Sequence, residues 1–100
     1  MPRKDTRREA SATRITPHKD VVSRQVDDEM VLVHLTRNHV FALNATGARL
    51  WELISEGYSR PDAVERMLDE FEVPRRELEE EVASFVRLLI REDLVREEPD

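Results

Sequence analysis

The sequence of 100 residues contains no cysteine, only two glycines and only five aromatic residues. Without cysteine there is no disulfide framework, no thiolate metal site and no cysteine nucleophile, and the cytoplasm is the expected location. Two glycines cannot build a glycine-rich loop that cradles phosphates. No apolar run approaches the ~18 to 20 residues of a membrane-spanning helix, so we expect no membrane insertion.

Charge is what the chain has in excess, at 38% of residues and a formal net charge of −6. Residues 1–20 carry six basic and three acidic side chains, a net of +3, and the remaining eighty carry ten basic and nineteen acidic ones, a net of −9. We therefore predict a basic, disordered N-terminal arm over residues 1–20, one folded domain over 21–96 and an acidic tail over 97–100. For the arm, the favoured interpretation is a solvated segment that binds nothing, and the alternative is contact with nucleic acid or an acidic partner.

Three segments have the short, β-rich pattern of strands: Val21–Val26, Met30–Leu35 and His39–Leu43. The middle segment is almost wholly apolar, which predicts a central strand buried on both faces. A two-residue turn at Arg37 and Asn38 would join the last two strands. One face of the sheet would then hold His34, Thr36, His39 and Phe41, and the other face would hold Val33, Leu35, Val40 and Ala42.

The apolar period then changes to that of helices, of which three are predicted. Asn44 and Ser59 are placed to cap the first two, and Gly57 follows the first where a left-handed residue ends a helix. The third is expected from about Arg75 to Glu92. The order predicts an α+β, winged-helix-like domain, with a three-stranded antiparallel meander followed by three helices.

Two functions suit this shape: reading of DNA by the last helix, and capture of an extended peptide along an open sheet edge. The last helix begins with four glutamates, Glu77 and Glu79 to Glu81, which would repel phosphates. We therefore predict no nucleic-acid partner, with a helix-turn-helix regulator as the alternative. A homodimer joined through the open sheet edge is a third possibility.

A groove for a peptide is expected between the third strand and the third helix. One flank of that helix, Ala83, Val86 and Ile90, would form one wall, although the same flank could pack beneath its neighbours instead. Arg87 and Arg91 would pair with carboxylates nearby. The predicted contact residues are His39, Val40, Phe41, Ala42, Leu43, Ala83, Val86, Arg87, Ile90 and Arg91.

The three histidines, His18, His34 and His39, are too few for a closed zinc site without a nearby carboxylate or thiol, so a structural or surface role is favoured. No paired acid and base, nucleophile or phosphate loop is recognisable in the pattern. We expect a protein that is not an enzyme and that needs no metal or cofactor.

Two stretches, Asp28–Leu35 and Phe41–Leu53 with its Leu-Asn-x-x-Gly-x-x-x-Trp segment, resemble the PqqD family of pyrroloquinoline quinone synthesis, also called the RiPP recognition element. The resemblance runs from about Val21 to Val95. It implies a module that binds the leader of a ribosomally made precursor peptide as an extra strand beside the third strand. It also implies a modifying enzyme as partner, either a radical SAM enzyme or a leader peptidase or cyclase of a lasso-peptide pathway.

Two places depart from the members dedicated to the quinone pathway. Residues 35–38 read Leu-Thr-Arg-Asn in place of an Ala-Pro-Glu-like stretch, and residues 55–57 read Ser-Glu-Gly in place of Cys-Asp-Gly. The resemblance is therefore nearer to the stand-alone recognition elements of lasso-type clusters.

Overall fold

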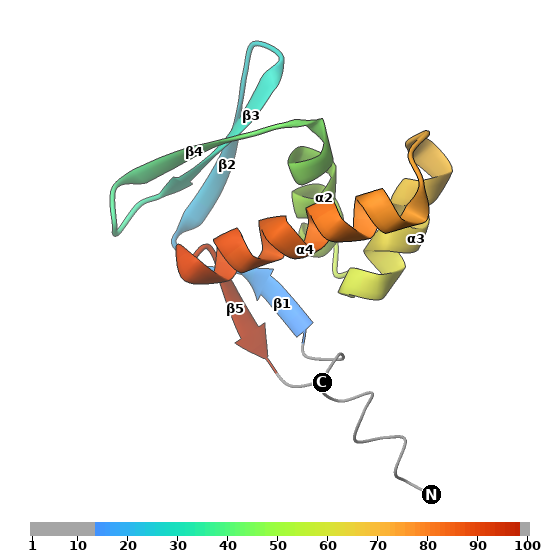
Figure 1. The fold of residues 1–100 in the computed structure, drawn as a ribbon. Coiled ribbons are helices and arrows are strands. Elements are labelled where there is room, and N and C mark those ends of the chain that lie inside the picture. Colours follow the sequence, from blue (N-terminus) through green and yellow to red (C-terminus); the bar gives the residue numbers. More distant parts are fainter. Residues whose placement is uncertain (1–13, 99–100) are drawn as a thin grey trace, which may run out of the picture.

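The computed structural model describes residues 14–98 as a small α+β domain with two sheets and three helices (Figure 1). Strands β2, β3 and β4 form an antiparallel meander, and β1 and β5 form a separate antiparallel pair. The elements are β1 Arg14–Pro17, β2 Val21–Val26, β3 Glu29–His34, β4 His39–Leu43, α2 Ala45–Ser55, α3 Arg60–Glu70, α4 Arg75–Arg91 and β5 Val95–Glu98. The predicted fold class, a meander followed by three helices, is confirmed.

The turns of the meander use left-handed residues other than glycine. Asp27 has φ 56° and Asn38 has φ 60°, a conformation that Asp and Asn tolerate better than other side chains. The β3–β4 connection spans four residues, 35–38, and places His34 opposite His39, so the predicted two-residue turn is wrong. The error shifts the register by two residues, an even number, so the strand residues keep their predicted faces, whereas Leu35 and Thr36 lie in the connection and on neither face.

The meander is covered on one face only. Leu32, His34 and Leu43 are buried, whereas Val22 and Val40 on the opposite face are exposed. The prediction that β3 is buried on both faces is therefore wrong, because among residues 14–98 the helices pack on a single side of this sheet. The apolar composition of β3 instead leaves valines on an open face.

The helices begin and end at the expected residues. Asn44 Oδ1 accepts a hydrogen bond from the Gly47 N–H at 2.8 Å, and Ser59 Oγ accepts one from the Asp62 N–H at 3.2 Å. Gly57 has φ 99° just beyond α2, and α4 ends at Arg91, one residue before the predicted end. The side chains thus satisfy N–H groups that helix starts leave without a partner.

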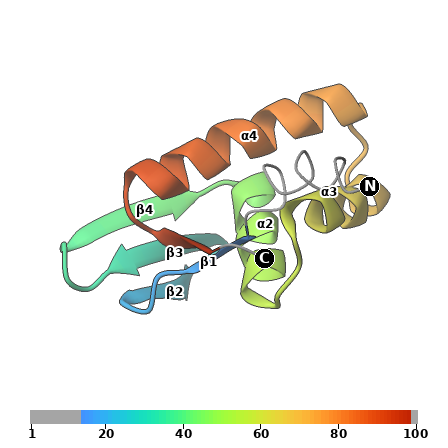
Figure 2. The same ribbon diagram turned by 90° about the horizontal axis from the view of Figure 1, so that it is seen from below.

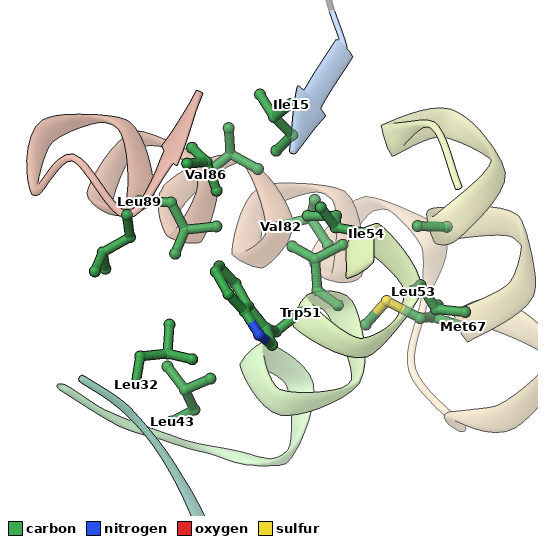
Figure 3. Close-up of a cluster of buried hydrophobic side chains, with 14 of the residues drawn as sticks. Ile15, Leu32, Leu43, Trp51, Leu53, Ile54, Met67, Val82, Val86 and Leu89 are labelled. Atoms are coloured by element: carbon green, nitrogen blue, oxygen red, sulfur yellow. The ribbon is translucent and has the colours of Figure 1, made fainter. Parts of the chain in front are cut away.

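The core lies where α2 crosses between the meander and the other two helices (Figure 3). Trp51 occupies its centre, with Leu32 and Leu43 of the meander on one side and Leu89 of α4 on another. Ile54 and Met67 continue the core toward α3. Residues 14–98 contain no helix both long and apolar enough to cross a bilayer.

The β1–β5 pair differs from the predicted domain boundaries. Ile15 lies opposite Glu97 and is only 7% exposed, so residues 14–20 belong to the fold rather than to an arm. Glu97 and Glu98, predicted as tail, are in a strand. The rest of the predicted arm and tail, residues 1–13 and 99–100, lie outside the described residues. Local composition missed the pair because the partner of β1 is eighty residues away along the chain.

Candidate functional site

Strand β4 is the edge of the meander that faces α4 (Figure 2). It pairs with β3 on one side, and within residues 14–98 it has no strand partner on the other. An edge strand presents a row of backbone N–H and C=O groups that an added strand can bind. Phe41 points to the packed side of the sheet, and Val40, 65% exposed, points to the open side.

A hollow of about 510 Å³ runs along α4 beside the end of β4, and we name it the front groove. It is lined by Asn44, Thr46, Gly47, Glu81, Ser84, Phe85, Arg87, Leu88 and Arg91. Three of these residues belong to the start of α2 and its cap, and the other six belong to α4. The groove therefore lies where β4 passes into α2, with α4 as its long wall.

The floor of the front groove depends on a close approach between α2 and α4. A Cβ atom at Gly47 would lie 3.2 Å from Phe85 Cζ and 3.3 Å from Asn44 Oδ1. A side chain at this position would require the Phe85 ring or the Asn44 side chain to move by a few tenths of an ångström, so glycine favours this close approach. Phe85 is half-buried there and packs against the core.

The structure divides the predicted α4 residues between two sides of the helix. Arg87 and Arg91 line the front groove, as expected. Val86 and Ile90 instead line a second hollow of about 560 Å³, together with Ile15 and Val64, which we name the rear groove. Val86 is 4% exposed and is part of the core.

Helical geometry explains why the predicted residues of α4 are divided between the two grooves. At about 100° per residue, Phe85 and Leu88 fall on one side of the buried stripe of α4, and Ala83, Val86 and Ile90 fall on the other. The flank predicted from the sequence therefore does not line the front groove, and the predicted contact residues do not include Glu81, Ser84, Phe85 and Leu88, which do. A signal for this flank is present in the sequence, since Phe85 and Leu88 form an apolar pair at i, i+3.

Charged groups meet where the start of β4 approaches the end of α4. The His39 Nδ1 to Glu92 Oε1 distance is 4.0 Å, and Arg91 Nε lies 3.3 Å from Glu92 Oε2. Arg87 forms no ion pair with any residue in the range 14–98. One end of the front groove thus carries a guanidinium that has no counter-ion among the described residues.

Three side chains form the one group in residues 14–98 that could hold a metal ion: His18, His34 and Asp93. Both histidine Nε2 atoms lie 3.6 Å from Asp93 Oδ2, and Arg37 Nε lies 3.4 Å from it. The Nδ1 atoms accept backbone N–H groups, from Asp20 for His18 and from Arg37 for His34. The Nε2–Oδ2 distances exceed that of a hydrogen bond, and the buried Nε2 of His34 has no hydrogen-bond partner among residues 14–98.

The same corner contains one perturbed carboxyl group. Thr36 Oγ1 donates a hydrogen bond of 2.6 Å to Asp20 Oδ2, which lowers the pKa of Asp20. This bond ties the β1–β2 connection to the β3–β4 loop. Together with the contacts of Asp93, it holds the loop that precedes β4 in place.

The sequence from residue 29 to 95 matches the family described as Coenzyme PQQ synthesis protein D (PqqD). The chain belongs to the PqqD family. A solved structure of TbiB1 in complex with the TbiA(beta) leader peptide has 34% sequence identity to this PqqD-family chain and a TM-score of 0.76, with 85% of this chain and 99% of that chain covered. A lasso peptide synthetase B1 complexed with the leader peptide has 24% identity and a TM-score of 0.74, covering 82% and 96%, and so shares the fold. None of the curated proteins compared with the chain matches it.

Proposed function

We propose that this PqqD-family domain binds the leader segment of a ribosomally made precursor peptide as an added strand on the free edge of β4. The observation that carries the proposal is the unpaired β4 edge beside the front groove, in a chain 34% identical to a protein solved with a leader peptide. Alternate side chains of the added strand enter the front groove against Phe85 and Leu88.

Energetics require both the edge and the groove. Each backbone hydrogen bond contributes only about 1 kcal/mol net, while ordering a disordered segment costs about 2 to 5 kcal/mol. Two or three aliphatic or aromatic anchors, at about 1.5 to 3 kcal/mol each, bring the affinity into the micromolar to nanomolar range. An edge strand without the adjoining hollow would bind weakly.

The bound leader is then presented to a modifying enzyme, either a radical SAM enzyme or a leader peptidase or cyclase. Strand addition suits this task because it holds only the leader and leaves the rest of the precursor free to enter another active site. The departures at residues 35–38 and 55–57 favour the lasso-type partner.

The test is titration of the full chain with leader peptides of the precursors encoded beside its gene, followed by ¹⁵N–¹H spectra and amide hydrogen exchange. We expect shifts in residues 39–43 and 81–91, and slower exchange at alternate amides of β4, since only alternate N–H groups point away from β3. Shifts confined to the rear groove would refute the proposed site.

A matched pair of variants separates the two sides of α4. Leu88→Glu places a charge in the front groove, and Ile90→Glu places the same charge in the rear groove, where Ile90 is 39% exposed. We expect at least a tenfold weaker affinity for Leu88→Glu, the loss of about 1.4 kcal/mol or more of apolar contact, and little change for Ile90→Glu. The reverse order would assign the peptide to the other flank.

A further inference from the structure

The charges of α4 are separated along its length. Its first two turns contain Arg75 and Arg76 together with four acidic side chains, Glu77, Glu79, Glu80 and Glu81, whereas the charged side chains of its last two turns, Arg87 and Arg91, are both basic. Helix α4 and strand β4 run in opposite directions, since Glu92 lies beside His39 while Glu81 shares the front groove with Asn44. The groove therefore has an acidic end near Asn44 and a basic end near His39.

Ion pairs among residues 14–98 offset most of the charges on α4, but not those of Glu81 and Arg87 in the front groove. Arg75 pairs with Glu65 and Glu79, and Arg76 with Glu80. Glu81 and Arg87 form no ion pair with any of residues 14–98, although both line the front groove. Arg91 is offset by Glu92, so Arg87 is the main positive charge at the basic end.

The spacing of these two charges fits a short extended segment. Six residues separate Glu81 from Arg87, about 9 Å along a helix. Side chains on one face of a strand recur about every 6.6 Å, so the first and fifth residues of a strand, with one side chain of the same face between them, lie about 13 Å apart. Long charged side chains at the two ends can close the difference, and the middle side chain then lies over Phe85 and Leu88.

We propose that the front groove selects a leader segment with the order basic, x, apolar, x, acidic, in which the acidic side chain meets Arg87 and the basic one meets Glu81. This order assumes that the added strand is antiparallel to β4, as are the strand pairs among residues 14–98. Such a strand runs from the Glu81 end of the groove to the Arg87 end. This inference rests on the proposed function and adds to it the chemistry and the direction of the ligand.

Charge at such a rim acts more on selectivity and association rate than on affinity. Exposed pairs of this kind are worth a factor of about three to five in affinity at low salt, and the effect declines as salt screens them. The apolar side chain at the centre carries the larger part of the binding. The expected signature is therefore a preference among peptides that all bind.

The probe is a phage-displayed library of random 12-residue peptides, selected against the full chain at low salt. We expect enriched peptides to carry the basic, x, apolar, x, acidic order. Selection with the Arg87→Glu variant should replace the acidic residue at the last position by Lys or Arg, and Arg96→Glu, a reversal on β5 away from the front groove, should leave the preference unchanged.

Enriched peptides are then synthesised with Glu or Lys at the last position and titrated into both proteins while the amide signals of β4 are followed. A reversal of about tenfold or more in the affinity ratio between wild type and Arg87→Glu supports the inference. Peptides that shift β4 amides with no charge preference, or with the opposite order, overturn it and leave the proposed function standing. A library that yields no peptide shifting β4 amides counts against both.

Discussion

Asp93 has two separate roles at the end of α4, one through its left-handed backbone and one through its carboxylate. Its φ is 61°, its N–H donates to the Ile90 carbonyl at 3.1 Å, and the next N–H, that of Leu94, donates to the Leu89 carbonyl at 2.8 Å. This is the Schellman arrangement that usually uses glycine. The Asp93 carboxylate meanwhile faces His18, His34 and Arg37.

Two substitutions separate the backbone demand from the charge. Asp93→Asn keeps a residue that tolerates the left-handed conformation and removes only the charge, so we expect a loss of about 0.5 kcal/mol in the free energy of unfolding. Asp93→Ala removes the charge and also the side chain that tolerates the left-handed conformation, and we expect a further loss of about 1 kcal/mol in the free energy of unfolding. Urea unfolding at pH 7 measures both, and equal losses would show that the left-handed backbone costs nothing here.

At the scale of elements, α2 and α3 are joined by an arginine with two carboxylate partners. Arg49 binds both oxygens of Glu70, at 2.8 and 2.9 Å, and also Glu52 at 3.0 Å. The hydrogen bonds that Arg49 donates lower the pKa of Glu70, and the same bonds, accepted by Glu70 and Glu52, raise the pKa of Arg49. A bidentate pair of this kind fixes the relative position of two helices more than a single contact does.

The lowered pKa of Glu70 predicts the direction of the pH dependence. Because the folded-state pKa is below the unfolded-state value, the stabilisation is present above about pH 5 and is lost as the pH falls through the folded-state pKa. Glu70→Gln should lower the urea midpoint at pH 7 and lower it by less at pH 3.

The control is Glu72→Gln, since Glu72 is exposed and forms no ion pair with a residue in 14–98. We expect the difference between the urea midpoints at pH 7 and pH 3 to be the same for Glu72→Gln as for the wild type. An equal effect of Glu70→Gln at both pH values would show that the ion pair is not the cause.

At the scale of the whole molecule, the β1–β5 pair brings the two ends of the described chain together. Ile15 and Val95 are both buried and join the core below α4. The pair closes the rear groove and leaves the free edge of β4 untouched. The β1–β5 pair and the proposed peptide-binding edge of β4 therefore lie at different edges of the domain.

Substitution of Ile15 tests whether this closure stabilises the domain. Ile15→Ala should lower the free energy of unfolding by about 2 to 4 kcal/mol, because a buried side chain is lost from a contact between the chain ends. Thr16→Ala, the neighbouring and less buried position, should change it by no more than about 0.5 kcal/mol. Urea midpoints that are the same for Ile15→Ala and the wild type would contradict the assignment of residues 14–20 to the fold.

The features that the sequence predicted are those with a local cause. Asn44, Ser59 and Gly57 mark helix ends because each acts on backbone groups within four residues, and the structure confirms all three. The meander and its edge strand followed from a period of two and two short connections. Local physics of this kind needs no knowledge of distant residues.

The sequence by itself determined the class of the domain, its helix ends and the strand that offers an open edge. Only the tertiary structure decided which flank of α4 faces that edge, because a rotation about the helix axis depends on what Leu89 and Val86 meet across the core. The tertiary structure also decided that Ile15 belongs to the folded domain, since its strand β1 pairs with β5 from the other end of the described chain. Contacts between residues far apart in sequence leave no periodic signal, and packing alone selects among the arrangements that the local pattern allows.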